Sequence, residues 1–300
     1  MISILICSRD KTLLNYISEN VKNTIGVPYE IIAIDNSEGK YGICKAYNLG
    51  AKQAKYNIFC FIHEDITFET QNWGANIVNH LKDESVGLIG VVGADPMYKM
   101  PCTFAQNLLK SEANIIVYSN DQKHINHIKT IKKDDNSIIK QVTGIDGVFM
   151  CTRRDVYQKC QFDEATLKGF HAYDADFSLQ ILQKYKVCVV FDVLIQHFSS
   201  GHADKNFMDS YLKLCFKWKS KLPISYQKYL KQEMVDGHWK VMEVFITKLF
   251  ELNYSNGFIL KQYFYFSFNN FFRVKPFLSI FKSMLLLKFY SRLKGFIMLI

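Results

Sequence analysis

The sequence predicts an α/β fold with a mostly parallel sheet flanked by helices, followed by a helical C-terminal extension. Short apolar runs alternate with segments of helical periodicity over about the first 200 residues. These runs are apolar throughout, as expected of strands that are buried on both faces. Beyond about residue 205 the strand-like runs stop. We therefore expect an α/β domain over residues 1–205 and a helical, basic and aromatic region over residues 206–300.

The elements are expected in the following order. Apolar runs predict strands over 2–7, 29–35, 57–62, 86–93, 147–151 and 186–193. Apolar residues at helical spacing predict helices from Leu13 to Val21 and over 42–55, 153–160 and 174–185. Within 96–140, Pro96, Pro101 and the polar run from Asn120 to Asn136 predict loops with room for a hairpin. Further helices are expected from Phe207 to Trp218 and within 224–252, with a break near Asp236-Gly237.

Composition excludes several classes of protein. A chain of 300 residues with 49% hydrophobic and 22% charged residues is globular rather than disordered. The sequence has no G-x-x-x-x-G-K-[ST], G-x-G-x-x-G or G-x-S-x-G motif, which disfavours P-loop, ordinary dinucleotide-binding and α/β-hydrolase sites. Its eight cysteines include no C-x-x-C pair, and residues such as Cys60 are expected to be small buried hydrophobes.

Location is predicted from the same composition. The N-terminus has no basic start and only a short apolar run, so we expect no signal peptide and a reduced, cytoplasmic protein. No stretch approaches the roughly 20 apolar residues of a membrane span. The formal net charge is +9. Seven Lys and Arg residues follow Glu251, and no acidic residue does. The basic character therefore belongs mostly to the C-terminal region.

Polar side chains follow the predicted strands, where ligands of open α/β sheets bind. Ser8 and Arg9 follow the first, Asp35 and Asn36 the second, His63 and Asp65 the third, and His197 the last. His63-x-Asp65, with His197, could hold a divalent cation, since Mn²⁺ accepts imidazole beside carboxylate. The alternative is a hydrogen-bonded histidine in a turn with Asp65 as a helix N-cap, and it stays open.

Three further carboxylates are candidates. Asp174 and Asp176 precede or open a predicted helix, so either N-caps it or serves as a general base at a loop–helix junction. Asp146 stands between Gly144 and Gly147, where it is either a turn residue or a ligand to a hydroxylated substrate. Residue types alone do not decide between these alternatives.

The order of these signals resembles that of the family 2 glycosyltransferases with a GT-A fold, over about residues 1–203. It is most similar to a subgroup with H-x-D, D-G-x-F, Y-D-x-D and H-x-S-x-G-like patterns. The matching segments are Asp35-Asn36-Ser37, Ala46 to Gly50, Phe61 to Asp65, Gly147 to Arg154, Phe162-Asp163-Glu164, Tyr173 to Asp176, and His197. The resemblance implies a GT-A-type, Rossmann-like sheet.

The sequence departs from the usual family pattern at three positions. His63 stands at the first Asp of D-x-D, Tyr173 at the Glu of an E-D motif, and Tyr47 where Arg is common. Metal binding therefore depends more on Asp65 and His197, and Asp174 matches the family's catalytic base.

The resemblance implies transfer of a sugar from a nucleotide-diphosphate sugar, foremost a UDP-sugar, to an acceptor hydroxyl. Asp35 would bind the base or ribose beside Ser8 and Arg9, with Asn36, Asn48 and His63 also on the donor side. The metal ligands Asp65 and His197 would hold Mn²⁺ or Mg²⁺ on the diphosphate. Asp174 would deprotonate the acceptor and give inversion, and Asp146 and Asp176 would bind sugar hydroxyls or orient the base.

The C-terminal region has three interpretations. A basic, aromatic and apolar segment favours contact with an anionic membrane surface, while packing on the domain is the alternative, and nucleic-acid binding lacks a motif. Membrane contact would suit a glycan or lipid-linked acceptor in bacterial surface polysaccharide or lipooligosaccharide assembly, at the inner face of the plasma membrane. The rival functions are a sugar-nucleotide nucleotidyltransferase, whose Gly-rich loop is missing after Cys7, and a non-catalytic, membrane-associated scaffold.

Overall fold

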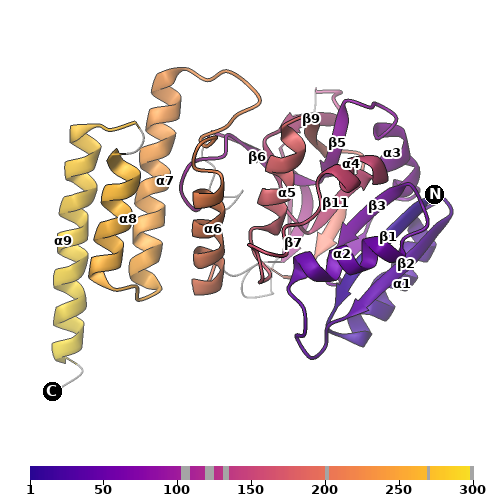
Figure 1. Ribbon diagram of the computed structural model, residues 1–300, viewed down its shortest axis with the longest axis horizontal. Coiled ribbons are helices and arrows are strands. Elements are labelled where there is room, and N and C mark those ends of the chain that lie inside the picture. The colour runs from indigo at the N-terminus through magenta and orange to yellow at the C-terminus, as the bar shows by residue number, and fades with distance from the viewer. Residues whose placement is uncertain (103–108, 119–124, 131–134, 200–202, 269–270, 298–300) are drawn as a thin grey trace.

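The computed structural model describes residues 1–300 apart from 103–108, 119–124, 131–134, 200–202, 269–270 and 298–300. Two adjoining sheets with helices on their faces form one end of the molecule, and the C-terminal helices extend from them along the long axis (Figure 1). The predicted α/β class and the helical extension are confirmed.

The larger sheet carries most of the predicted strands, in the order β2-β1-β3-β11-β5-β12-β9. Strands β1, β2 and β3 run parallel, as do β5 and β12, whereas β11 and β9 run antiparallel to their neighbours. The sheet is therefore mixed, with parallel strands on both sides of β11. Its members are β1 (Ile2–Ser8), β2 (Tyr29–Asp35), β3 (Ile58–Ile62), β5 (Val86–Gly90), β9 (Ile139–Val142), β11 (Phe149–Arg153) and β12 (Lys186–Val190).

The smaller sheet is made of strands that the sequence analysis mostly did not predict. Its order is β10-β6-β7-β13-β4, with β8 paired antiparallel to β7 as the expected hairpin. The members are β4 (Ile66–Phe68), β6 (Val92–Asp95), β7 (Lys110–Tyr118), β8 (Ile125–Lys129), β10 (Gly144–Ile145) and β13 (Ile195–His197). The single strand expected over 86–93 is wrong, because Gly90 ends β5 and the chain enters the smaller sheet as β6.

Helices cover both faces of the larger sheet. Residues of α1 and α3 share one apolar core with β1, and residues of α2, α4 and α5 share another on the opposite face. Ile2, Ile4 and Ile6 of β1 point into the first core and Leu5 into the second, which is why the whole strand is apolar. The helices are α1 (Lys11–Thr24), α2 (Ile43–Gln53), α3 (Trp73–His80), α4 (Arg154–Lys159) and α5 (Tyr173–Leu182).

A third apolar core lies among the C-terminal helices α6 (Lys205–Lys217), α7 (Lys231–Glu251), α8 (Asn256–Phe268) and α9 (Val274–Ile297). Helix α6 joins the two regions, since its Leu214 packs in the sheet core and its Leu212 in the helical core. The domain division at residue 205 stays a prediction. Among the described residues, no helix combines the length and apolarity that crossing a membrane requires.

One further expectation is wrong, and one is incomplete. Helix α7 runs through Gly237 without a break. The glycine is needed for packing instead, because a Cβ there would lie 1.9 Å from the Tyr98 hydroxyl. Cys60 is buried as expected, but it is not a free thiol. It forms a disulfide with Cys151 on the neighbouring strand β11.

Candidate active site

The loops after β1 and β3 are joined by a carboxylate. Glu64 accepts hydrogen bonds from the backbone N–H groups of Arg9 and Asp10 at 3.0 and 3.2 Å. In the sheet register Ser8 lies beside Asp35, at the carboxyl ends of β1 and β2. The predicted donor-side residues Ser8, Arg9 and Asp35 are therefore neighbours at the same edge of the larger sheet.

Asp35 and Arg9 are both exposed at this edge. Oδ1 of Asp35 accepts hydrogen bonds from the backbone N–H of Ser37 at 3.0 Å and from its hydroxyl at 2.7 Å, and these bonds lower the pKa of Asp35. The Arg9 guanidinium lies 5.8 Å from the centre of the Phe170 ring. An ionised carboxylate and an exposed guanidinium suit a ribose hydroxyl and a phosphate respectively.

Two other predicted donor-side residues have structural roles instead. The buried Asn36 side chain bonds both backbone polar groups of Tyr41, at 2.8 and 2.9 Å, and so shapes its own loop. Asn48 is also buried, donating to the Phe162 carbonyl at 2.9 Å and accepting from the Tyr157 hydroxyl at 2.6 Å. Because their amide groups already bond protein atoms, we no longer assign either residue to nucleotide binding.

His63, Asp65 and His197 converge from three strand ends. Their ligand atoms all lie within 4.8 Å of one another, with Asp65 Oδ2 at 3.4 Å from His197 Nε2 and Asp65 Oδ1 at 3.8 Å from His63 Nδ1. His197 does not follow β12 directly, as expected, but ends the short strand β13, whose pairing with β4 brings it to Asp65. The long-range prediction that joined His197 to the H-x-D segment agrees with this geometry.

Within this group the pKa values of Asp65 and His63 are both lowered. Burial alone would raise the pKa of Asp65, but the hydrogen bond and charge of His197, together with His63, hold it well below its usual range. Burial, and then the nearby His197, lower the pKa of His63. An ionised Asp65 carboxylate and a neutral His63 imidazole are the forms that bind a divalent cation.

The three residues that depart from the family pattern lie together. The Tyr173 hydroxyl is 2.9 Å from Nε2 of His63, and the Tyr47 ring is 5.9 Å from that of Tyr173. Gly147 leaves room for this arrangement, since a Cβ there would lie 2.0 Å from the Tyr173 hydroxyl. Tyr173 thus fixes one nitrogen of His63 and leaves Nδ1 on the side of Asp65.

Asp174, the next residue, is buried in the first turn of α5. Its Oδ2 accepts a hydrogen bond from the Gly147 N–H at 3.0 Å, and its Oδ1 accepts one from the Ala175 N–H at 2.8 Å. Burial, and then the nearby Asp146 carboxylate, raise the pKa of Asp174 to about 7. Such a carboxylate can take a proton near neutral pH, as a general base must.

The other two predicted carboxylates, Asp146 and Asp176, differ in burial and in their hydrogen-bond partners. Asp146 is partly exposed, and its Oδ1 accepts from the Val148 N–H at 2.9 Å in a turn. Asp176 is buried, and it accepts from Lys217 at 2.8 Å and from the Trp218 indole at 2.7 Å. We therefore keep Asp146 as a candidate sugar ligand and assign Asp176 to holding α6 against α5.

The raised pKa of Asp174 predicts how stability depends on pH. Between about pH 4 and 7 the folded state holds a proton that the unfolded state has lost, so stability falls as pH rises through this window. Asp174→Asn cannot titrate. We expect its free energy of unfolding, relative to that of wild type, to be about 1–3 kcal/mol larger at pH 8 than at pH 5, because wild type loses stability over this range and the variant does not. Urea unfolding at both pH values measures this difference, with Asp155→Asn as the control, and a difference that does not change with pH would contradict the assignment.

Sequence reasoning missed two contributors. Glu64 stood inside the H-x-D segment, but nothing in the sequence shows that it reaches the backbone of Arg9 and Asp10. Tyr173 was noted as a departure from the family pattern without a partner. Tyr173 and His63 are 110 residues apart in the sequence, and only the fold brings them into contact.

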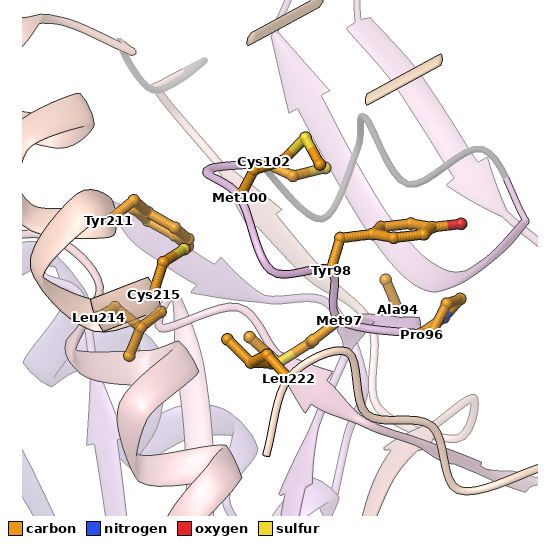
Figure 2. Close-up of a pocket in the computed structure, with 10 residues that line it drawn as sticks. All are labelled: Ala94, Pro96, Met97, Tyr98, Met100, Cys102, Tyr211, Leu214, Cys215 and Leu222. Atoms are coloured by element: carbon orange, nitrogen blue, oxygen red, sulfur yellow. The ribbon is translucent and has the colours of Figure 1, made fainter. Parts of the chain in front are cut away.

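An apolar pocket that none of these residues line lies where α6 meets the segment after β6 (Figure 2). Tyr211, Leu214 and Cys215 of α6 line one side, and Met97 and Leu222 face them. The lining offers few polar groups, so we assign the pocket to the joint between the sheets and the C-terminal helices.

Comparisons with known proteins bear on this site. Residues 3–213 match the model of the "Glycosyltransferase like family", whereas no curated protein matches the sequence. The crystal structure of GalNAc-T7 with UDP, GalNAc and Mn²⁺ aligns with a TM-score of 0.52 and 12% identity, over 74% of this chain and 48% of that one. The crystal structure of A197 from STIV aligns with a TM-score of 0.38 and 14% identity, over 66% of this chain and 86% of that one. A TM-score this low does not indicate a shared fold. The likeness to GalNAc-T7 shows the fold, and this chain spans less than half of that protein.

Proposed function

This chain belongs to the glycosyltransferase-like family whose model matches residues 3–213 and has a GT-A glycosyltransferase fold, and we propose that it is an inverting sugar transferase. The proposed donor is a nucleoside-diphosphate sugar and the proposed acceptor a hydroxyl group. One observation carries the proposal. His63 lies between Asp65 and Tyr173, so the cation-binding residues stand next to the buried base Asp174. In a direct displacement, the leaving group and the attacking hydroxyl lie on opposite sides of one sugar carbon. The residues that bind the leaving group and the base should therefore be only a few side chains apart.

A divalent cation fits His63, Asp65 and His197. Two imidazoles and one carboxylate within 4.8 Å form a donor set that suits Mn²⁺ better than Mg²⁺, which prefers oxygen. The structural neighbour GalNAc-T7 was crystallised with UDP and Mn²⁺, which supports this choice. When bound, such a cation would stabilise charge on the diphosphate leaving group as a Lewis acid.

On the donor side, exposed Arg9 and Asp35 face the nucleotide in this proposal. The hydrogen bond that Glu64 accepts from the Arg9 backbone holds the loop after β1 close to His63 and Asp65. Asp35 would accept hydrogen bonds from the ribose or base, and Arg9 would bind phosphate. We propose UDP as the nucleotide because it is the one present in the GalNAc-T7 structure.

On the acceptor side, Asp174 takes the proton of the attacking hydroxyl. Hydrogen bonds from Gly147 and Ala175 fix its two oxygens, so little reorganisation is needed at the moment of transfer. One base and no protein nucleophile give attack opposite the leaving group, and hence inversion. Asp146 would orient a sugar hydroxyl beside it. The proposed acceptor is a glycan or lipid-linked glycan at the inner face of the plasma membrane, as in bacterial surface polysaccharide or lipooligosaccharide assembly.

The test is turnover with a panel of nucleoside-diphosphate sugars, Mn²⁺ and simple sugar acceptors. We expect release of the nucleoside diphosphate from one donor, with the product's anomeric configuration inverted by NMR. Retention of configuration would contradict the assignment of Asp174 as the sole catalytic carboxylate. No release from any donor by folded protein would favour the scaffold, and pyrophosphate release from a nucleoside triphosphate and a sugar phosphate would favour a nucleotidyltransferase.

The contact between Tyr173 and His63 gives a separate prediction. Tyr173→Phe keeps the ring that packs on Gly147 but removes the hydroxyl that orients His63. We expect Mn²⁺ affinity to fall about tenfold, as is usual when an outer partner of a ligating histidine is lost. Titration of Mn²⁺ followed by its electron paramagnetic resonance signal measures this. Tyr157→Phe, which removes a buried hydroxyl bonded to Asn48 instead, is the control. Equal affinity in wild type and Tyr173→Phe would show that the hydroxyl does not position His63.

A further inference from the structure

The outer surface of α8 and α9 exposes large apolar side chains. These helices lie at the end of the molecule farthest from β1 and β2 (Figure 1). We define the apolar face as six residues that are each between 40% and 62% exposed: Phe264, Phe268, Phe272, Val274, Leu278 and Leu285. Single exposed apolar residues need no explanation, but a contiguous set marks a site of interaction.

Ring contacts show that the apolar face is continuous across the two helices. Phe264, Phe268 and Phe272 form a ladder with successive ring centres 6.1 and 5.0 Å apart. Phe277 of α9 lies 6.0 Å from Phe264 and 5.4 Å from Phe272, so it links the ladder to the second helix.

On α9 the apolar face is narrow and distinct from the packed side. At about 100° per residue, Val274, Leu278 and Leu285 fall within about 40° of one another. Ile280 and Met284, which are buried in the helical core, lie on a different side of the same helix. The exposed stripe is therefore not part of the contact that holds α9 on the protein.

Positive charges flank the apolar face. Lys261 precedes Phe264 and Phe268 by three and seven residues and so shares their side of α8. Lys275 and Lys282 lie beside the stripe of α9, and all three lysines are exposed. None of the three forms an ion pair within the part of the chain that the structure describes, whereas Arg273 pairs with Asp236 at 3.1 Å. No acidic residue occurs after Glu251 to offset these charges.

We infer that this apolar face, with Lys261, Lys275 and Lys282 at its edges, docks on the surface of an anionic lipid bilayer. The phenylalanines and aliphatic residues enter the boundary between headgroups and acyl chains, and the lysines meet lipid phosphates. Charge complementarity selects this occupant over a second copy of the chain, because two such faces would bring six unpaired lysines together. The inference concerns the C-terminal helices alone and does not depend on the proposed reaction.

Cosedimentation of the full chain with vesicles tests the inference. Wild type should bind vesicles of phosphatidylglycerol and phosphatidylcholine more tightly than pure phosphatidylcholine, and less tightly as salt rises. The double variant Lys275→Gln/Lys282→Gln should lose about 25-fold in partitioning into the anionic vesicles. Phe268→Ser/Leu278→Ser, which changes the most exposed ring and an exposed leucine, should lose about tenfold or more.

Matched controls separate this surface from general charge. Lys45 and Lys52 are two exposed lysines that are also seven residues apart, on α2 at the other end of the molecule (Figure 1). Lys45→Gln/Lys52→Gln and Leu230→Ser should bind vesicles as wild type does. Thermal unfolding of each variant confirms that it is folded. Equal binding to neutral and anionic vesicles, no binding to either, or a dimer in light scattering that Phe268→Ser/Leu278→Ser dissociates would overturn the inference.

Discussion

We expect Asp174→Asn to lower kcat by about 10²–10⁴-fold, which is the usual contribution of a positioned general base. The amide oxygen can accept the hydrogen bond that Gly147 donates, whereas the amide NH₂ cannot accept the one from Ala175, so one of the two backbone bonds is kept. What is lost is the capacity to take the acceptor's proton. Nucleotide binding should stay unchanged, because the proposal assigns this side chain to the acceptor and not to the donor.

Initial rates at saturating donor measure this effect, with Asp155→Asn as the matched control. Asp155 is also an aspartate in the first turn of a helix, but it is exposed and pairs with Arg153. In wild type, kcat/KM should rise with pH to a plateau above about pH 7, because the pKa of Asp174 is raised to about 7 and only the ionised form accepts a proton. A kcat for Asp174→Asn within a few-fold of wild type would remove Asp174 from its role.

The second large effect is expected at Asp65. Asp65→Ala removes the one carboxylate of the proposed cation-binding group and leaves two imidazoles. We expect turnover to fall about 10³-fold or more, since Lewis-acid stabilisation contributes several kcal/mol and each 1.36 kcal/mol is about tenfold. Added Mn²⁺ should not restore the rate.

Asp192→Ala is the control for this variant. Asp192 also pairs with a histidine, 2.9 Å from His80, and among the described residues this pair has no third ligand beside it. It should lower stability by removing that bond but leave the dependence of turnover on Mn²⁺ intact. If Asp65→Ala and Asp192→Ala reduced turnover alike, Asp65 would have no special part in catalysis.

Much of the fold could be predicted because apolar strands buried on both faces leave a plain pattern. The predicted strand over 2–7 lies within β1, which is buried along almost its whole length, and the predicted helix over 42–55 contains α2. Short strands such as β13 escaped prediction, since three residues carry no periodicity. The turn at Gly90, which moves the chain from one sheet to the other, also has no local signal within an apolar run.

The site was predictable in its residue types and strand ends, but not in its side-chain partners. His63, Asp65 and His197 were grouped because ligands gather where strands end, and the structure places them together. Asn36 and Asn48 also stand near strand ends or in family motifs, yet their amides face inward and bond protein atoms. Sequence position fixes where a residue lies along an element, whereas the direction of its side chain depends on the packing of distant segments.

The most direct measurement is thermal unfolding with a panel of nucleoside diphosphates, with and without Mn²⁺, for wild type and Asp65→Ala. A ligand at about 100 times its Kd should add about 2.7 kcal/mol to the stability of the folded state. We expect one nucleotide, foremost UDP, to raise the Tm of wild type only with Mn²⁺, and the shift to vanish in Asp65→Ala. A well-folded wild type whose Tm no nucleotide moves, with or without Mn²⁺, would contradict the proposed donor site.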